Sequence, residues 1–112
     1  MDLNKYQQLA LRTAKTGDQT YDLRHAALGL ASEVGEFTTT VKRVAIYDVE
    51  LTPTLKENIV EELGDVMWYI CLAANAVGAS LTEIAAGNIA KLALRYPERY
   101  TNEAAELRAD KV

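Results

Sequence analysis

The chain has 112 residues, of which 49% are hydrophobic, and it carries a net charge of -4 at neutral pH. A chain of this length builds one domain around a small core, and a negative net charge gives no long-range attraction to nucleic-acid phosphates or anionic lipid. These values exclude several large domains, and we expect neither nucleic acid nor membrane as a partner.

The number of cysteines and the length of the apolar runs bear on the cellular location of the protein. Cys71 is the single cysteine, so no internal disulfide can form, and its apolar neighbours predict a small buried side chain. The longest apolar runs are interrupted by Glu, Gly or Asn, and no secretory leader is visible at the N-terminus. We therefore expect a cytoplasmic protein.

The first half of the chain predicts two helices. Asp2 is a candidate N-cap for a short helix that stops near residues 16–18, where Gly17 lies between polar residues. From Asp22 to about Tyr47 there is no proline, and apolar residues recur at helical spacing. This second helix contains Glu33 and Glu36.

The second half predicts two more helices and a tail. The third begins at residues 52–54, where Thr54 and Glu57 offer a capping box, and it ends at Gly78. The fourth begins with the capping box Ser80-x-x-Glu83 and stops at Tyr96-Pro97. Residues 101–112 are polar and Ala-rich, which predicts a loose or weakly helical tail after a single domain of residues 1–100.

The expected fold is therefore an all-α bundle of four helices. The connection between the second and third helices is short, about residues 48–53, so these two long helices should be antiparallel neighbours. The abundance of Ala and Leu indicates apolar faces that a second copy of the chain could complete, so we expect homo-oligomerisation.

Two acidic pairs, Glu33-x-x-Glu36 and Glu62-x-x-Asp65, interrupt the apolar stretches of these long helices. Residues three apart share a helix face, so each pair can direct two carboxylates at one point. Oxygen ligands without imidazole or thiolate favour Mg²⁺ or Mn²⁺ and phosphate chemistry. The alternative is that the acids are solvated or salt-bridged residues of amphipathic helices, because Glu is common in helices.

A cationic face is predicted on the fourth helix. Asn88, Lys91 and Arg95 fall at helical spacing, and they can offer two cations and an amide to phosphate oxygens. The alternative is that the cations complement the dipole at the C-terminus of the helix.

Three sequence blocks together resemble the all-α MazG-like nucleoside triphosphate pyrophosphohydrolases, relatives of the dimeric dUTPases and the all-α dCTP pyrophosphatases. The blocks span residues 27–36, 61–66 and 88–97, and they occur in the family's order within about residues 22–100. The resemblance implies Mg²⁺-dependent hydrolysis of a nucleoside triphosphate to a monophosphate and pyrophosphate.

The resemblance also implies roles for individual residues. By this resemblance, the metal ligands are Glu33, Glu36, Glu62 and Asp65. One of these acids, or Glu61, orients or deprotonates the attacking water. Lys91 and Arg95 contact phosphates, and Asn88 contacts the sugar or a metal-bound water.

Several further residues have two readings. Trp68 could stack on a base or fill a core or subunit interface, and His25 could approach the base or sugar or be structural. Lys42 and Arg43 could reach phosphate or lie on a solvated face. Tyr96 is expected to anchor the end of the fourth helix.

A single four-helix unit cannot easily enclose a nucleotide, so a homodimer or homotetramer is expected. Two rival classes compete with the enzyme. A ferritin-like di-iron protein requires Glu-x-x-His twice, and His25, the single histidine, is not three residues after an acid. A noncatalytic helical dimerisation or adaptor module would need only the apolar faces.

Overall fold

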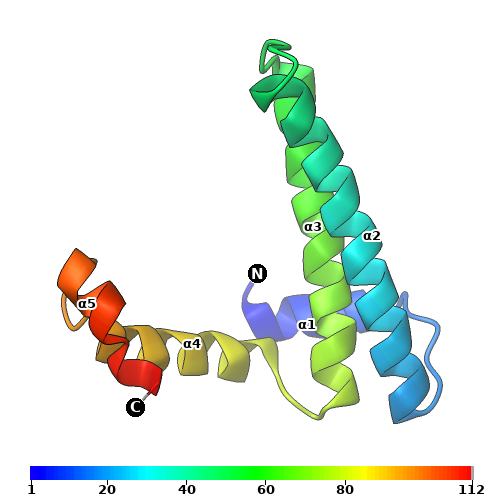
Figure 1. The fold of residues 1–112 in the computed structure, drawn as a ribbon. Helices are drawn as coiled ribbons and strands as arrows, with labels where there is room; N and C mark the ends of the chain where they lie inside the picture. Colours follow the sequence, from blue (N-terminus) through cyan, green and yellow to red (C-terminus); the bar gives the residue numbers. More distant parts are fainter. Residues whose placement is uncertain (112) are drawn as a thin grey trace.

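The computed structural model describes residues 1–111, and this part of the chain is helical without strands (Figure 1). The predicted all-α class is confirmed. Val112, the last residue of the predicted tail, lies outside the described residues. The elements in chain order are α1 (Leu3–Leu11), α2 (Gln19–Ala45), α3 (Pro53–Ala76), α4 (Leu81–Arg95), α5 (Asn102–Leu107) and the 3-10 helix η1 (Ala109–Lys111).

Two predicted helix starts are confirmed by their caps. The Asp2 carboxylate accepts the backbone N–H of Lys5 at 2.8 Å, and the Ser80 hydroxyl accepts that of Glu83 at 3.0 Å. Each side chain thereby satisfies an N–H group that has no partner within its own helix.

The other two starts differ from the prediction. Helix α2 begins before Asp22, because Asp18 is its cap and accepts the N–H of Tyr21 at 2.8 Å. Thr52, not Thr54, caps α3 by accepting the N–H of Leu55 at 3.2 Å. In both cases the residue nearer the N-terminus is the N-cap, because the connecting loop already holds its backbone in the extended conformation that an N-cap requires.

Helix α1 ends at Leu11, several residues before the predicted stop. Thr13 follows the end of the helix, and its hydroxyl donates to the carbonyl of Ala10 at 2.7 Å. The same hydroxyl accepts the indole N–H of Trp68 on α3 at 2.9 Å. The end of α1 is therefore fixed by a tertiary contact that local sequence does not contain.

The long helices α2 and α3 lie side by side and antiparallel, as predicted, and form a hairpin (Figure 1). Leu72 and Ala26 are about 1% exposed and lie in the hairpin, and α1 packs across α3. Cys71 is fully buried in a small cluster with Ala10, Ala74 and Leu81, which confirms the predicted buried thiol. The core is therefore concentrated where α1, α3 and the start of α4 meet.

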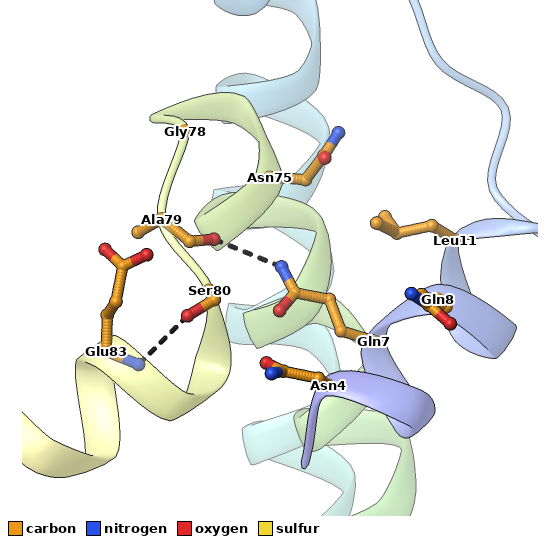
Figure 2. Close-up of a pocket in the computed structure, with 9 residues that line it drawn as sticks. All are labelled: Asn4, Gln7, Gln8, Leu11, Asn75, Gly78, Ala79, Ser80 and Glu83. Atoms are coloured by element: carbon orange, nitrogen blue, oxygen red, sulfur yellow. Dashed lines mark hydrogen bonds between the residues drawn. The ribbon is translucent and has the colours of Figure 1, made fainter.

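Helix α4 leaves α3 at 97° through an elbow formed by residues 77–80. The Gln7 side chain of α1 fixes this elbow, because its amide N–H donates to the carbonyl of Ala79 at 3.1 Å (Figure 2). The amide oxygen of Gln7 accepts the N–H of Leu81 at 2.8 Å. Helix α4 packs against α1, α5 and η1, and its far end points away from the hairpin (Figure 1). One chain therefore does not close the predicted four-helix bundle.

The resulting shape is extended. The radius of gyration is 17.1 Å, whereas a compact chain of this length has about 13 Å. The accessible surface is 8037 Å², against about 6,100 Å² expected for a compact protein of this mass. Large apolar side chains lie on the open surface of the hairpin and of α4, each more than 60% exposed. They include Leu28, Val60, Ile89 and Leu94.

The predicted tail is ordered by packing. Residues 101–107 contain a short helix, α5, capped by Thr101, and η1 packs back onto α4. Within residues 1–111, no single helix is both long and apolar enough to cross a membrane. Helices α3 and α4 meet that test only as a pair, across their 97° bend.

Candidate metal centre

The two acidic pairs come together at the middle of the hairpin. Glu33 from α2 and Glu62 and Asp65 from α3 each place a carboxylate oxygen within 4.8 Å of the others. We call these three residues the acidic cluster. The i, i+3 spacing places Glu62 and Asp65 on one face of α3, and the antiparallel packing of α2 brings Glu33 opposite them.

Glu62 is the acid most affected by this arrangement. Its pKa is raised from 4.5 to about 7, first because burial removes the carboxyl from water. The neighbouring carboxyl of Glu36 raises the pKa further, and that of Glu33 follows, because each disfavours a second negative charge beside it. Glu36, exposed and one turn after Glu33, therefore contributes to the field of the acidic cluster.

The oxygens of the cluster fit a hard cation. Glu33 Oε2 and Glu62 Oε2 are buried and have no hydrogen-bond partner. Buried carboxylate oxygens without a donor are costly, and a divalent cation would relieve both desolvation and repulsion. The donor set is made of carboxylates alone, which is the chemistry that Mg²⁺ and Mn²⁺ accept.

A cavity of about 330 Å³ lies beside the acidic cluster and is lined by Glu33, Asp65, Trp68 and Tyr69. Trp68 is thus close to the acids, as its spacing of three residues after Asp65 predicts. Its indole is held by the hydrogen bond to Thr13, so the ring has a fixed direction. The cavity combines acidic oxygens with aromatic surface.

His25 belongs to the aromatic group behind this cavity. Its ring centroid lies 5.7 Å from that of Tyr69 and 6.3 Å from that of Trp68, and both pairs meet edge to face. The Nδ1 atom of His25 is buried without a hydrogen-bond partner. His25 therefore contacts two rings that line the cavity, and it is not a member of the acidic cluster.

Tyr69 is a site residue that the sequence reasoning missed. Its ring lies over Gly29 of α2, where an added Cβ would come to 2.0 Å from the Tyr69 ring. Glycine at position 29 therefore makes room for a ring that lines the cavity. The signal that could have found this contact is a glycine inside a long helix, because glycine there is unfavourable unless a neighbour packs closely against it. At Gly35, in contrast, an added Cβ would meet no atom of a neighbouring element within 4 Å.

The remaining acid of the prediction lies elsewhere. Glu61 is exposed and lines a separate cavity of about 340 Å³ with Lys56, Glu57 and Val60. One residue of helical rotation separates it from Glu62 and directs it to another surface of α3. Glu61 is therefore not part of the acidic cluster.

The predicted cationic face is not assembled with the acids in one chain. Lys91 is exposed, and Asn88 lines an apolar cavity of about 280 Å³ in the corner between α3 and α4. Arg95 pairs with Asp110 of η1, with Nε 2.7 Å from Oδ1. Helix α4 points away from the hairpin (Figure 1), and Asn88, Lys91 and Arg95 neither belong to the acidic cluster nor line the cavity beside it.

Two further cations also lie on open surface. Lys42 and Arg43 are exposed near the end of α2, and Lys42 Nζ lies 5.7 Å from the ring centroid of Tyr47. The solvated reading of both residues fits this arrangement. Tyr96 follows α4 directly and contacts Tyr100, with the ring centroids 5.3 Å apart.

A larger cavity lies at the elbow, not at the acids. It measures about 570 Å³ and is lined by polar groups of α1, the end of α3 and the elbow, among them Asn4, Gln8 and Asn75 (Figure 2). It contains no member of the acidic cluster and no aromatic ring. The smaller cavity beside the acids therefore carries the candidate chemistry.

Comparisons with known proteins agree with the motif blocks. The family model described as MazG nucleotide pyrophosphohydrolase domain matches residues 22–100, which confirms the resemblance inferred from the sequence. The "Gene 37 protein" of Mycobacterium phage L5 is 33% identical over 79 residues, covering 70% of this chain and 69% of that protein. No solved structure matches the chain.

Proposed function

Because the chain belongs to the MazG nucleotide pyrophosphohydrolase family, we propose that it hydrolyses a nucleoside or deoxynucleoside triphosphate to the monophosphate and pyrophosphate. The observation that carries this proposal is the acidic cluster, with two buried, unpartnered carboxylate oxygens beside a cavity lined by Trp68 and Tyr69. Acids and aromatic rings are the groups that a metal-bound triphosphate and a base require.

Glu33, Glu62 and Asp65 would hold Mg²⁺, or Mn²⁺ as a substitute, and Glu36 supplies a further carboxylate one turn away. When bound, such a cation activates water and offsets negative charge on the phosphates. The chain's own acids orient the attacking water and take up its proton. We place the general base among these four acids, because Glu61 lines a different cavity.

The base is proposed to lie against Trp68 and Tyr69, with His25 behind them. Trp68 is held by its hydrogen bond to Thr13, and the ring of Tyr69 packs over Gly29, which has no side chain to displace it. The aromatic surface is therefore ordered before the substrate binds. An ordered surface binds with less loss of side-chain entropy than a mobile one.

The phosphate contacts are proposed to come from a second copy of the chain. Asn88, Lys91 and Arg95 are not part of the acidic cluster or of the cavity beside it in their own chain, and the apolar faces of the hairpin and α4 remain open. The accessible surface exceeds that of a compact protein by about 1,900 Å², which is enough for a standard interface. A homodimer or homotetramer would bury these faces and bring α4 of one copy to the acids of another.

The division of the chain into a domain of residues 1–100 and a tail of residues 101–112 remains part of the proposal, as does a cytoplasmic location. The free thiol of Cys71 suits a reducing compartment. The proposed substrate is a free nucleotide, and neither nucleic acid nor membrane is proposed as a partner.

The test is incubation of the protein with a panel of nucleoside and deoxynucleoside triphosphates and Mg²⁺, with monophosphate resolved from diphosphate and pyrophosphate from phosphate. We expect monophosphate and pyrophosphate, loss of turnover in EDTA, and its return with Mg²⁺ or Mn²⁺. Turnover that persists in EDTA would overturn the metal assignment.

A noncatalytic dimerisation module is the second candidate, and the open apolar faces favour it. Asp65→Asn separates the two, because it should abolish turnover in an enzyme and be neutral or stabilising in a scaffold. Glu57→Gln is the matched control, since Glu57 is an exposed acid of the same helix outside the cluster. No turnover by the unmodified protein, together with a more stable Asp65→Asn variant, would favour the scaffold.

A further inference from the structure

Two of the three nitrogens of the Arg95 guanidinium bind a carboxylate of the C-terminal segment (residues 101–111). Arg95 Nε donates to Asp110 Oδ1 at 2.7 Å, and Nη2 donates to Oδ2 at 3.0 Å. The Asp110 side chain has no exposed surface, and that of Arg95 is 21% exposed. Two parallel bonds of this kind form the strong, directional pairing of arginine with a carboxylate.

The C-terminal segment is shaped to deliver this carboxylate. Helix α5 ends at Leu107, and its C-cap, Arg108, has a left-handed backbone with φ of 50°. The chain then turns into η1, which packs on α4. A left-handed conformation is unfavourable for a residue with a side chain, but here it closes the helix, because the Arg108 N–H donates to the carbonyl of Ala104 at 3.1 Å. Within residues 1–111, the pair of Arg95 and Asp110 is the one ion pair that connects this segment to α4.

The charge state of the pair is stable at neutral pH. The hydrogen bonds from Arg95 lower the pKa of Asp110, and the bonds to Asp110 raise the pKa of Arg95. Both groups therefore remain ionised under the conditions in which a nucleotide would bind, and release of Arg95 requires another anion rather than a proton.

A carboxylate and a phosphate bind arginine in the same way, because each offers two oxygens that accept two parallel N–H bonds from the guanidinium group. The donors of Arg95 that hold Asp110 cannot hold a phosphate at the same time. We propose that the C-terminal segment is a tethered competitor, in which Asp110 occupies Arg95 until pyrophosphate or the phosphate chain of a nucleotide displaces it. This inference rests on the proposed role of Arg95 in binding phosphate.

The consequence is a weakened apparent affinity for phosphate ligands. The apparent dissociation constant equals the intrinsic constant divided by the fraction of molecules in which Arg95 is free, so a segment bound in about nine molecules of ten weakens binding about tenfold. The same competition would help pyrophosphate to leave after hydrolysis, because Asp110 returns to Arg95 as the product departs.

The test measures binding of pyrophosphate with Mg²⁺ to the full chain by calorimetry. Asp110→Asn keeps the shape of the side chain and removes its charge, and it should bind pyrophosphate about tenfold more tightly. Glu106→Gln is the control, because it removes one negative charge from an exposed position of the same segment. It should bind like the unmodified protein, and Arg95→Gln should remove the gain when combined with Asp110→Asn. An Asp110→Asn variant that binds pyrophosphate no more tightly than Glu106→Gln would overturn the proposal.

A second measurement uses the unmodified protein and does not depend on the folding of a variant. The amides of Ala105, Arg108 and Lys111 are hydrogen-bonded within the C-terminal segment. Saturating pyrophosphate should accelerate hydrogen exchange at these amides as the segment is displaced. Unchanged exchange at saturation would also overturn the proposal.

The outcome can be separated from that of the proposed function. Tighter binding of pyrophosphate by Asp110→Asn supports the competitor even if no nucleotide is hydrolysed. Hydrolysis with the same KM in Asp110→Asn and in the unmodified protein would support the proposed function and overturn the competitor.

Discussion

The hairpin of α2 and α3 and the region of α4 with the C-terminal segment differ in how far their proposed sites are assembled. In the hairpin, three carboxylates from two helices meet beside an aromatic cavity. In the α4 region, Lys91 is exposed and Arg95 is engaged by Asp110. One chain preorganises the acids of the proposed metal half, whereas we propose that the phosphate half is completed by a partner subunit and by release of Arg95.

The largest effect is expected from the hairpin. Glu62→Gln removes a proposed metal-binding carboxylate from the centre of the acidic cluster, and kcat/KM should fall by about 10³-fold, as for loss of a principal electrostatic group. Steady-state kinetics with Mg²⁺ checks this, with Glu57→Gln as the control. A loss of less than about tenfold would show that the preassembled cluster is not the reacting centre.

The next effect tests whether the two halves come from different copies. Glu62→Gln and Arg95→Gln should each be nearly inactive alone, because each lacks one half of the site. In a symmetric dimer with shared sites, an equal mixture that exchanges subunits should recover roughly a quarter of the unmodified rate. An inactive mixture, with exchange demonstrated by mass spectrometry, would mean that both halves come from the same chain.

A pair of glycine variants contrasts the packing of the two regions. Gly29→Ala would place a Cβ against the ring of Tyr69 and should destabilise the protein by about 1–3 kcal/mol through overpacking. Gly87→Ala on α4 meets no atom within 4 Å and should stabilise by up to about 1 kcal/mol through helix propensity.

Urea unfolding at fixed protein concentration measures both glycine variants. If Gly87→Ala proves destabilising, a partner subunit must cover this face of α4, which would sharpen the comparison. A neutral Gly29→Ala variant would contradict the close contact with Tyr69.

The smallest effect is a pH dependence of stability in the metal-free protein. Folding raises the pKa of Glu62 from 4.5 to about 7, so between these values the folded state binds more protons than the unfolded state. Stability should therefore fall as the pH rises from about 4.5 to about 7. Thermal unfolding of the protein in EDTA should show this slope, and Glu62→Gln should reduce it. A slope that is unchanged in the variant would assign the effect to other groups.

Local signals in the sequence were sufficient for the helices. Asp2 and Ser80 cap helices where predicted, because an N-cap depends on a side chain and the N–H group three residues later. The competition between Asp18 and Asp22, or between Thr52 and Thr54, was not decided locally. In each pair both residues can cap, and the path of the preceding loop selects one of them.

The site was predictable to the extent that it depends on helical spacing. Spacing alone places Glu62 and Asp65 on one face, but it cannot say which of Glu61 and Glu62 turns toward α2, because that depends on the packing of the hairpin. Tyr69 was missed for the same reason. Its place is set by contact with Gly29, which is 40 residues away in sequence.

The sequence by itself determined the all-α class, the family, the two antiparallel helices and the acids that face each other, because these follow from short-range periodicity and a short connection. The tertiary structure alone decided the direction of α4, which Gln7 fixes across the elbow, and the pairing of Arg95 with Asp110. These contacts join residues whose separation in sequence carries no periodic signal. Their free energy comes from satisfying buried polar groups, which only the folded chain brings together.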